Sequence, residues 1–238
     1  MTELLYQTDS YLQEFETRIV AVNPETVAVA LECTAFYPGG GGQPHDLGRL
    51  RVDENDLLVT KVQRQGEHVW HTVDGPLPTI GTPVVGHIDW ERRYQLMRTH
   101  TALHVLCGVV WRDYGAQVTG GNMEPLQGRM DFEFEVLQRE LVQEIEARVN
   151  AEAQQAHAVQ VRILPRAEAF QIPDLIRTKI NLLPEGINEV RTVEIVGLDL
   201  QADGGTHVAN TREVGHVRVV NYQSKGRINK RIYIALDT

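Results

Sequence analysis

Two histidines in the segment RTHTALHVL, His100 and His104, are four residues apart. The segment has helical periodicity, and residues four apart lie on one face of a helix, with β-carbons about 5–6 Å apart. One metal ion can therefore accept a nitrogen from each imidazole at about 2.0–2.1 Å. The alternative is that both histidines only form hydrogen bonds along the helix. No glutamate adjoins His100, so the HExxH pattern of zinc proteases is absent.

Two further candidate ligands lie in the segment LQADGGTHV, residues 200–208, where Asp203 precedes His207 by four residues. The paired glycines between them are first of all a turn signal, because glycine reaches backbone angles that other residues avoid. If that turn directs both side chains toward one point, His207 supplies a third ligand and Asp203 a fourth. Cys107 shares the helical face of the two upstream histidines and is a rival ligand, but we favour a small buried residue there.

A run of four glycines, residues 39–42, ends at Gln43 in the segment TAFYPGGGGQPHDLG. Backbone N–H groups in such a run approach a substrate closely, and the Gln43 amide can position a water or a hydroxyl. The alternative is a plain connection between two strands.

The composition is that of an ordinary globular protein, with 238 residues, 42% hydrophobic and 23% charged. No apolar run has the length of a membrane span, and the acidic N-terminus lacks the layout of a signal peptide. Two cysteines, Cys33 and Cys107, do not make a disulfide framework, so we expect a cytoplasmic protein.

The net charge of −9 argues against non-specific coating of DNA or RNA, and we expect neither a DNA nor a membrane partner. Two local basic clusters, at residues 91–98 and 225–231, are nevertheless dense enough to contact phosphates. The alternative is that both are solvated surface charges. The candidate RNA-binding residues are Arg92, Arg93, Lys225, Arg227, Lys230 and Arg231.

The periodicity divides the chain into an N-terminal β domain, residues 1–90, and an α+β domain, residues 91–238. Short alternating segments predict strands at 16–22, 26–32, 50–54, 57–63, 68–73 and 83–89, in a small barrel or sandwich. Helical patterns cover 90–115, 138–156 and 167–179. Further strands are predicted at 129–136 and 158–164, within 187–200, and in a closing hairpin at 216–236.

Four of these segments, in this order, resemble a known family. The segment RRYQLMRTHTALHVL resembles the HxxxH helix of the alanyl-tRNA synthetase editing domain, and DLQADGGTHV resembles that domain's Cys-Gly-Gly-Thr-His segment. The glycine-rich segment and the closing hairpin are similar to those of the freestanding relatives, the AlaX-type alanyl-tRNA editing proteins. The chain resembles their medium-length type, with a β-barrel-like domain before an editing domain of the alanyl/threonyl-tRNA synthetase second-additional-domain type.

The resemblance implies a hydrolase that deacylates, in trans, tRNA(Ala) mischarged with serine, and also a possible activity on Gly-tRNA(Ala). It implies one bound divalent metal, with zinc preferred, on His100, His104 and His207. Asp203 stands where the family commonly has cysteine, which makes it a fourth ligand or a nearby acceptor. Gly40, Gly41, Gly42 and Gln43 fall on the loop that lies near the editing pocket in relatives.

Selectivity for serine over alanine requires a pocket that forms a hydrogen bond with the extra hydroxyl. Three threonines lie in or beside the motifs as candidate partners of that hydroxyl: Thr34, Thr101 and Thr206. The metal either activates a water and polarises the ester carbonyl, or binds the substrate's α-amine and orients the ester.

Three rival functions remain at this point. A peptidyl-tRNA hydrolase of the release-factor kind would use the Gly-Gly-Gln tripeptide but would give the HxxxH pair no role. A non-catalytic tRNA-binding module would need a closed, four-ligand structural metal. A metal-dependent hydrolase of another small ester would not need the basic hairpin.

Overall fold

The structure of the protein is a computed structural model that describes residues 1–177 and 187–238. The chain forms two compact units, Met1–Tyr94 (the N-terminal unit) and Gln95–Thr238 (the C-terminal unit). The elements of the N-terminal unit are β1 (Glu3–Leu4), η1 (Leu5–Gln7), β2 (Glu14–Asn23), β3 (Ala28–Leu31), β4 (Cys33–Thr34), β5 (Gly48–Val52), β6 (Asn55–Gln65), β7 (His68–Asp74) and β8 (Pro83–Ile88).

Helix α1 (Trp90–Tyr114) begins in the last residues of the N-terminal unit and continues through the C-terminal unit. The remaining elements are β9 (Val118–Glu124), β10 (Gln127–Glu133), α2 (Arg139–Gln154), β11 (Val159–Pro165), α3 (Arg166–Ala169), β12 (Glu189–Ile195), β13 (Asp199–Ala202), η2 (Thr211–Val214), β14 (Val217–Ser224) and β15 (Asn229–Leu236). The predicted α+β class is confirmed.

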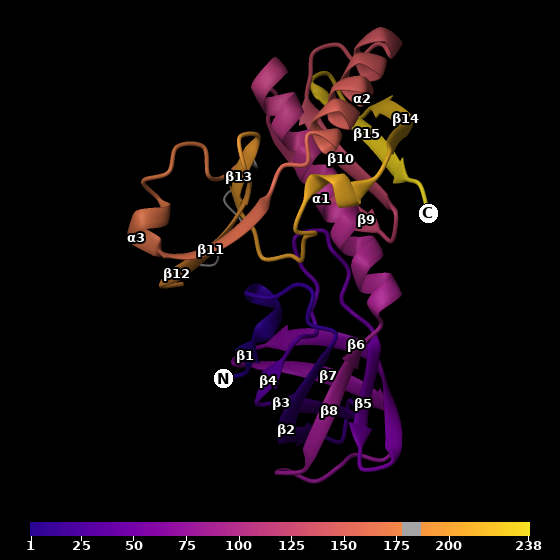
Figure 1. Cartoon of the computed structure of the whole chain (residues 1–238), viewed down its shortest axis with the longest axis vertical. Helices are drawn as coiled ribbons and strands as arrows, with labels where there is room; N and C mark the ends of the chain where they lie inside the picture. The colour runs from indigo at the N-terminus through magenta and orange to yellow at the C-terminus, as the bar shows by residue number, and fades with distance from the viewer. Residues whose placement is uncertain (178–186) are drawn as a thin grey trace. The chain divides into compact units, whose positions relative to one another are not determined.

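The N-terminal unit is a closed barrel in the strand order β2-β3-β7-β6-β5-β8, with β8 pairing back to β2 (Figure 1). All neighbouring strands are antiparallel. Alternate residues of each strand point inward, and the interior is filled by side chains such as Phe15, Phe36 and Leu50. Of the two predicted architectures, barrel or sandwich, the chain adopts the barrel.

The four-glycine run adopts backbone angles that explain its composition. Gly39, Gly40, Gly41 and Gly42 have φ values of +81°, +139°, +58° and +91°. Residues with a β-carbon rarely adopt such angles, so the conformation itself requires glycine at successive positions. The run turns back on itself, because Gly40 and Gln43 exchange backbone hydrogen bonds of 3.0 and 2.9 Å.

A buried histidine, His71 on β7, lies inside the barrel. Its Nδ1 lies 3.3 Å from the carbonyl oxygen of Val29, and its Nε2 lies 2.9 Å from the hydroxyl of Thr34. A neutral ring with the proton on Nδ1 satisfies both contacts, so the Thr34 hydroxyl donates to Nε2. Burial lowers the pKa of His71 from 6.5 to about 4.

This histidine makes the barrel less stable in acid. As the pH falls, the unfolded chain binds the proton near pH 6.5, whereas the folded chain binds it only near pH 4. Stability is therefore complete above pH 6.5 and falls between 6.5 and 4, by roughly 3 kcal/mol for this group. His71→Gln should remove that dependence. We expect denaturant titrations at pH 7 and pH 4 to show a smaller loss for the variant. Equal losses in the two proteins would contradict the prediction.

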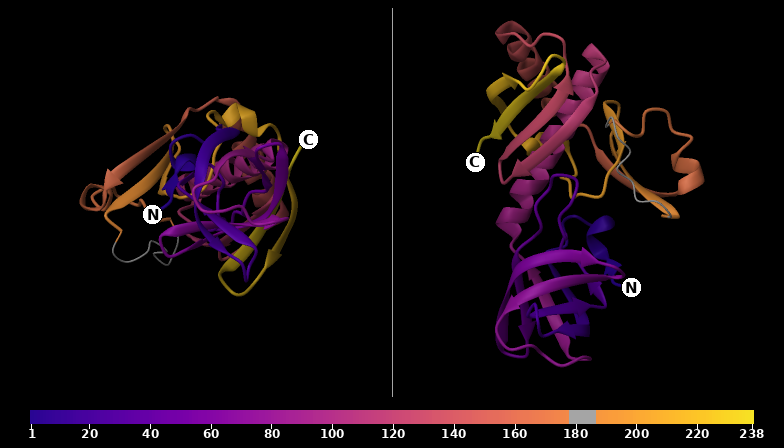
Figure 2. Two further views of the ribbon diagram at one scale, coloured as in Figure 1. Left: turned by 90° about the horizontal axis from the view of Figure 1, so that it is seen from below. Right: turned by 180° about the vertical axis from the view of Figure 1, so that it is seen from behind.

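The C-terminal unit places α1 between two sheets, of strand orders β14-β15-β10-β9 and β11-β12-β13 (Figures 1 and 2). Asp89 caps the helix, because its Oδ1 accepts a 3.2 Å hydrogen bond from the Arg92 N–H. Towards β10, Leu103 of α1 lies close to Gly128, and towards the β12–β13 turn, Gly108 lies close to Leu198. Within the described residues, no helix combines the length and the apolar character that crossing a membrane requires.

One predicted helix is wrong, and one strand has no counterpart among the predicted elements. The helix expected over 167–179 is α3, which ends at Ala169, and residues 178 and 179 lie outside the described residues. Pro173 explains the early end, since proline disfavours helical angles in the residue before it, and Asp174 adopts a φ of +55°. Strand β9 was not predicted at all, because Gly120 and Gly121 weaken the strand signal.

Candidate metal centre

Helix α1 brings His100 and His104 together, one helical turn apart, with ring centroids separated by 5.0 Å. Both side chains are almost completely buried. Neither ring is therefore a solvated surface group, and the pair lies within the C-terminal unit.

The loop after β13 carries Asp203 and His207. The Asp203 carboxylate closes this loop itself, because Oδ2 accepts a 2.7 Å hydrogen bond from the Gly205 N–H. Arg191 of β12 holds the start of the loop, donating from Nη1 to the Asp203 carbonyl oxygen at 2.9 Å. Neither Gly204 nor Gly205 is among the glycines with positive φ. The turn therefore depends on the aspartate rather than on angles that only glycine allows, contrary to the sequence argument.

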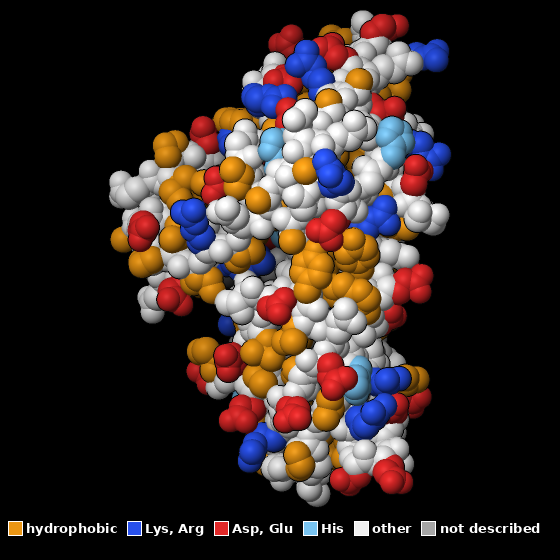
Figure 3. All heavy atoms as spheres, viewed as in Figure 1, with side chains coloured by type: hydrophobic (Ala, Val, Ile, Leu, Met, Phe, Trp, Pro, Cys, Tyr) orange, Lys and Arg blue, Asp and Glu red, His pale blue; other side chains and the backbone are white. Residues whose placement is uncertain are grey.

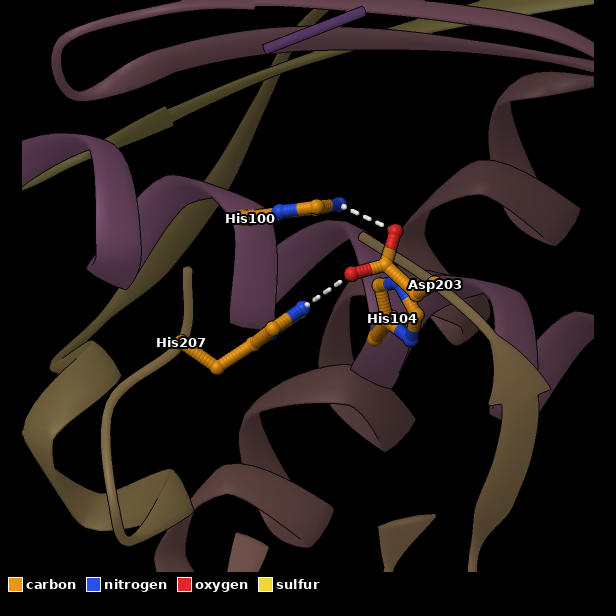
Figure 4. A group of neighbouring side chains, drawn as sticks. All are labelled: His100, His104, Asp203 and His207. Atoms are coloured by element: carbon orange, nitrogen blue, oxygen red, sulfur yellow. Dashed lines mark hydrogen bonds and ion pairs between the residues drawn. The ribbon is translucent and has the colours of Figure 1, made fainter. Parts of the chain in front are cut away.

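The four side chains converge (Figure 4). One potential ligand atom from each of His100, His104, Asp203 and His207 lies within 4.8 Å of the others. The ring centroid of His207 is 4.2 Å from that of His100 and 4.7 Å from that of His104. The Asp203 carboxylate reaches two rings, with Oδ2 3.0 Å from His207 Nε2 and Oδ1 3.6 Å from His100 Nε2.

His207 is also held from its other side. The hydroxyl of Thr101, on α1, lies 3.1 Å from His207 Nδ1 and accepts a 3.3 Å hydrogen bond from the Val208 N–H. A hydroxyl oxygen can accept two hydrogen bonds, so it can also accept from a proton on His207 Nδ1, and Nε2 is then left for a metal. Thr101 thus ties the histidine loop to the helix that carries the other two rings.

Burial sets the protonation of the cluster. It lowers the pKa of His100 well below 6.5 and that of His207 to about 4. Burial also lowers the pKa of His104, but the hydrogen bond to Asp199 and the nearby carboxylates outweigh it and raise that pKa. The Asp203 pKa would rise on burial, but the surrounding imidazoles hold it well below its usual range. His100 and His207 are thus neutral and Asp203 is ionised at neutral pH, the states in which these groups bind metals.

The donor set and its spacing fit a divalent ion. Two ligands of one tetrahedral ion, each at about 2.0–2.2 Å, lie roughly 3.4 Å apart. The two distances from Asp203 to the imidazole nitrogens, 3.0 and 3.6 Å, bracket that value. Imidazole nitrogen with carboxylate oxygen is a donor set that zinc accepts.

The other predicted chemical residues lie elsewhere. Cys107 is buried on α1 outside this cluster, and burial raises the pKa of its thiol well above 9. Thr34 is in the barrel, where its hydroxyl contacts His71 and accepts from the Phe36 N–H. Gln43 is buried at the end of the glycine run. Thr206 is buried next to His207.

The predicted RNA-binding residues fall into two groups. Arg93 is fully buried and paired with Asp46, so no phosphate can reach it. Lys230 is also buried and donates to two carbonyl oxygens of its own hairpin, and Arg231 forms two hydrogen bonds with Asp131. These three residues have internal roles that sequence reasoning missed. Arg92 is half-buried, whereas Lys225 and Arg227 are exposed at the turn between β14 and β15.

Two residues beside the cluster had not been anticipated, Asp199 and Arg191. Asp199 accepts from His104 at 3.2 Å, and Arg191 contacts Asp203. Their only sequence signal is their position in strands next to the DGGTH segment, which does not distinguish them from ordinary strand residues.

Known proteins resemble this chain along almost its whole length. Residues 190–233 match the threonyl and alanyl tRNA synthetase second additional domain, and residues 7–92 match the class II (A) tRNA synthetases. The alanyl-tRNA editing protein AlaX-M of Saccharolobus solfataricus is 40% identical over 98% of both chains. The protein of the same name from Methanosarcina barkeri is 38% identical over 99% of both chains. The alanine–tRNA ligase of Ignicoccus hospitalis is 36% identical over 92% of this chain, which corresponds to 24% of the ligase.

Proposed function

Because the chain belongs to the AlaX-M type of alanyl-tRNA editing proteins, we propose that it hydrolyses, in trans, the ester of tRNA(Ala) mischarged with serine. The observation that carries the proposal is the buried cluster of three histidines and one aspartate, whose spacing fits a divalent metal. Gly-tRNA(Ala) is a second candidate substrate. A tRNA substrate and the free thiols of Cys33 and Cys107 both fit a cytoplasmic location.

The residues of the cluster have separate tasks in this proposal. His100, His104 and His207 hold one divalent ion, preferably zinc, with Asp203 as a fourth ligand or as a hydrogen-bond acceptor for the rings. The ion, when bound, stabilises negative charge that develops on the ester oxygen or lowers the pKa of a water. Thr101 positions His207, and burial keeps His100 and His207 neutral and able to bind.

Selectivity follows from a polar partner for the serine hydroxyl. A site that donates to or accepts from that hydroxyl leaves its own group unpaired when alanine binds, which disfavours alanine strongly. Thr34, Thr101 and Thr206 are the candidate partners of that hydroxyl, and Thr101 and Thr206 are the two that lie beside His207, through a contact with its ring and through the chain. Gln43 and Gly40–Gly42 are proposed to position the substrate or a water.

The test is release of the amino acid from Ser-, Gly- and Ala-tRNA(Ala), with and without a chelator. We expect Ser-tRNA(Ala) to be hydrolysed at least about a hundredfold faster than Ala-tRNA(Ala), and the chelator to abolish the reaction. A fully metal-loaded protein that binds tRNA but releases no serine would favour the non-catalytic module. Hydrolysis of small esters with no response to mischarged tRNA would favour the third rival.

The exposed tip of the β14–β15 hairpin is the proposed contact for tRNA phosphates. On the face shown in Figure 3, basic and acidic side chains are interspersed, so a polyanion needs a local basic site. Lys225 and Arg227 are exposed at this tip, whereas Lys230 is buried within the hairpin and Arg231 pairs with Asp131 of β10.

Reversing both exposed charges, Lys225→Glu with Arg227→Glu, should raise KM about tenfold at physiological salt and leave the metal content unchanged. The salt dependence of log KM should also become shallower, by about one unit of slope for each lost phosphate contact. The control is Lys61→Glu with Arg64→Glu, an equal charge change on two exposed residues of β6. The same rise in KM for both pairs would mean that net charge, and not the hairpin, is responsible.

A further inference from the structure

A second carboxylate lies behind the cluster. Asp199, the first residue of β13, is buried, and its Oδ2 lies 3.2 Å from His104 Nδ1. An ionised carboxylate only accepts hydrogen bonds, so Nδ1 must carry the ring proton. Nε2 then keeps its lone pair and is the nitrogen of His104 that is left for a metal.

Two neighbours, Gln201 and Arg177, keep this carboxylate in place. The Gln201 side-chain amide donates to the same Oδ2 at 2.6 Å and to the Cys107 sulfur at 3.3 Å. On the other side of the carboxylate, Arg177 Nε lies 3.6 Å from Oδ1. The guanidinium of Arg177 in turn lies 4.7 Å from the ring centroid of Trp111. The carboxylate is therefore balanced by a cation on the side away from His104, and Gln201 requires an acceptor at Oδ2.

A glycine on α1 provides the space for this contact. Gly108 is one helical turn beyond His104, and it lies against the turn between β12 and β13. A β-carbon at this position would lie 2.9 Å from Leu198 Cγ and 3.1 Å from both the Leu198 carbonyl oxygen and Asp199 Cβ. Any larger residue would push the start of β13 away from the helix, and with it the Asp199 carboxylate.

We propose that Asp199 is a positioning residue for metal binding, which fixes the tautomer and orientation of His104, and that Gly108 provides the close approach that this requires. A hydrogen bond of this kind to a metal-binding histidine typically contributes a factor of about 10–100 to metal affinity. The inference rests on the metal site of the proposed function.

The first test is the zinc Kd of the full chain, measured by competition with a chromophoric chelator. Asp199→Leu removes the acceptor and should weaken zinc binding about a hundredfold. Asp199→Asn should weaken it only about tenfold, because the donor from Gln201 keeps the amide oxygen at the Oδ2 position and preserves the tautomer. His157→Ala is the control, because His157 pairs with Glu152 outside the cluster, and its expected change is less than about twofold.

Gly108→Ala is the second test, and it leaves both His104 and Asp199 unchanged. Alanine is the better helix former by about 1 kcal/mol, so α1 itself is not weakened. We nevertheless expect about tenfold weaker zinc binding, because the contact between β13 and the helix must open. If Asp199→Leu does not fold, the zinc Kd of Gly108→Ala still tests the inference.

A spectroscopic measurement separates positioning from general stability. In ¹⁵N NMR spectra of the metal-free protein, recorded at an alkaline pH at which the ring is neutral, His104 should carry its proton on Nδ1 in the wild type and in Asp199→Asn. In Asp199→Leu, a substantial fraction should be protonated on Nε2. Wild-type zinc Kd values in both Asp199→Leu and Gly108→Ala would overturn the inference. If the wild type itself bound no zinc, the metal site of the proposed function would fail instead.

Discussion

Replacing His100 and His207 together with alanine should reduce the zinc content from about one ion per chain to nearly none. Hydrolysis of Ser-tRNA(Ala) should fall by at least about a thousandfold, roughly 4 kcal/mol of transition-state stabilisation. Two of the three imidazoles are lost, and His104 with one carboxylate cannot hold a divalent ion tightly. Metal analysis of the purified protein and kcat/KM for the mischarged tRNA measure the two effects.

The control for this variant is His157→Ala, because His157 pairs with Glu152 outside the cluster. It should keep both zinc and activity. Undiminished zinc in the double variant would rule out the site.

Two substitutions test Asp203 separately. Asp203→Ala should weaken zinc binding about tenfold, whereas Asp203→Cys should bind zinc at least as tightly as the wild type, since thiolate is a good zinc ligand. Unchanged zinc affinity in Asp203→Ala would exclude this carboxylate as a ligand.

The part of the site that sequence predicts best is the part that is local. The spacing of His100 and His104 fixes their common face once the segment is a helix, and α1 is predictable because its helical pattern is long and begins directly after a capping residue, Asp89. The approach of His207 to this pair depends on two segments that lie far apart in the sequence. Its sequence signals are the turn before His207 and the resemblance of two separated segments to one family, and the structure brings the potential ligand atoms within 4.8 Å of one another.

The residues that were missed depend on contacts between distant segments. Asp199 lies 95 positions from His104, and Arg93 lies 47 positions from Asp46. No spacing rule reports whether such side chains meet. Charge in a cluster likewise does not reveal burial, so Arg93 and Lys230 resembled surface cations but are internal partners. The glycine run is also ambiguous in the sequence, because four glycines fit both a substrate-binding loop and a turn with unusual backbone angles. The positive φ angles of the run account for its glycines without a substrate.

The buried pair of Arg93 and Asp46 holds the segment that carries the glycine run. Both side chains are almost fully inaccessible, and Arg93 Nε donates to Asp46 Oδ1 at 2.9 Å. Arg93 also donates to the carbonyl oxygens of Ala35, at 2.5 Å, and Ser10, at 3.0 Å. Asp46 in turn accepts from the Tyr37 N–H at 2.6 Å, and its own N–H donates to the Tyr37 carbonyl oxygen. The two ends of the glycine-rich loop are therefore fastened to each other and to the first turn of α1.

Removing one partner of this pair should strongly destabilise the fold, because it leaves an uncompensated buried charge. We expect Arg93→Met or Asp46→Leu each to cost about 3–5 kcal/mol in the free energy of unfolding. The double variant should cost less than the sum of the two single changes, since neither charge remains, although several backbone groups stay without their partners. Denaturant titration of the full chain measures this. Additive losses, or single losses below about 1 kcal/mol, would contradict the coupling.

The double variant also separates the loop from the metal. The pair belongs to the N-terminal unit, whereas the four candidate ligands belong to the C-terminal unit, so zinc content should stay at the wild-type level. If the glycine-rich loop positions substrate, kcat for Ser-tRNA(Ala) should nevertheless fall about tenfold, because Gln43 and its backbone neighbours lose their anchor. Wild-type kcat in a folded, zinc-loaded double variant would show that the fastening of this loop serves only the barrel.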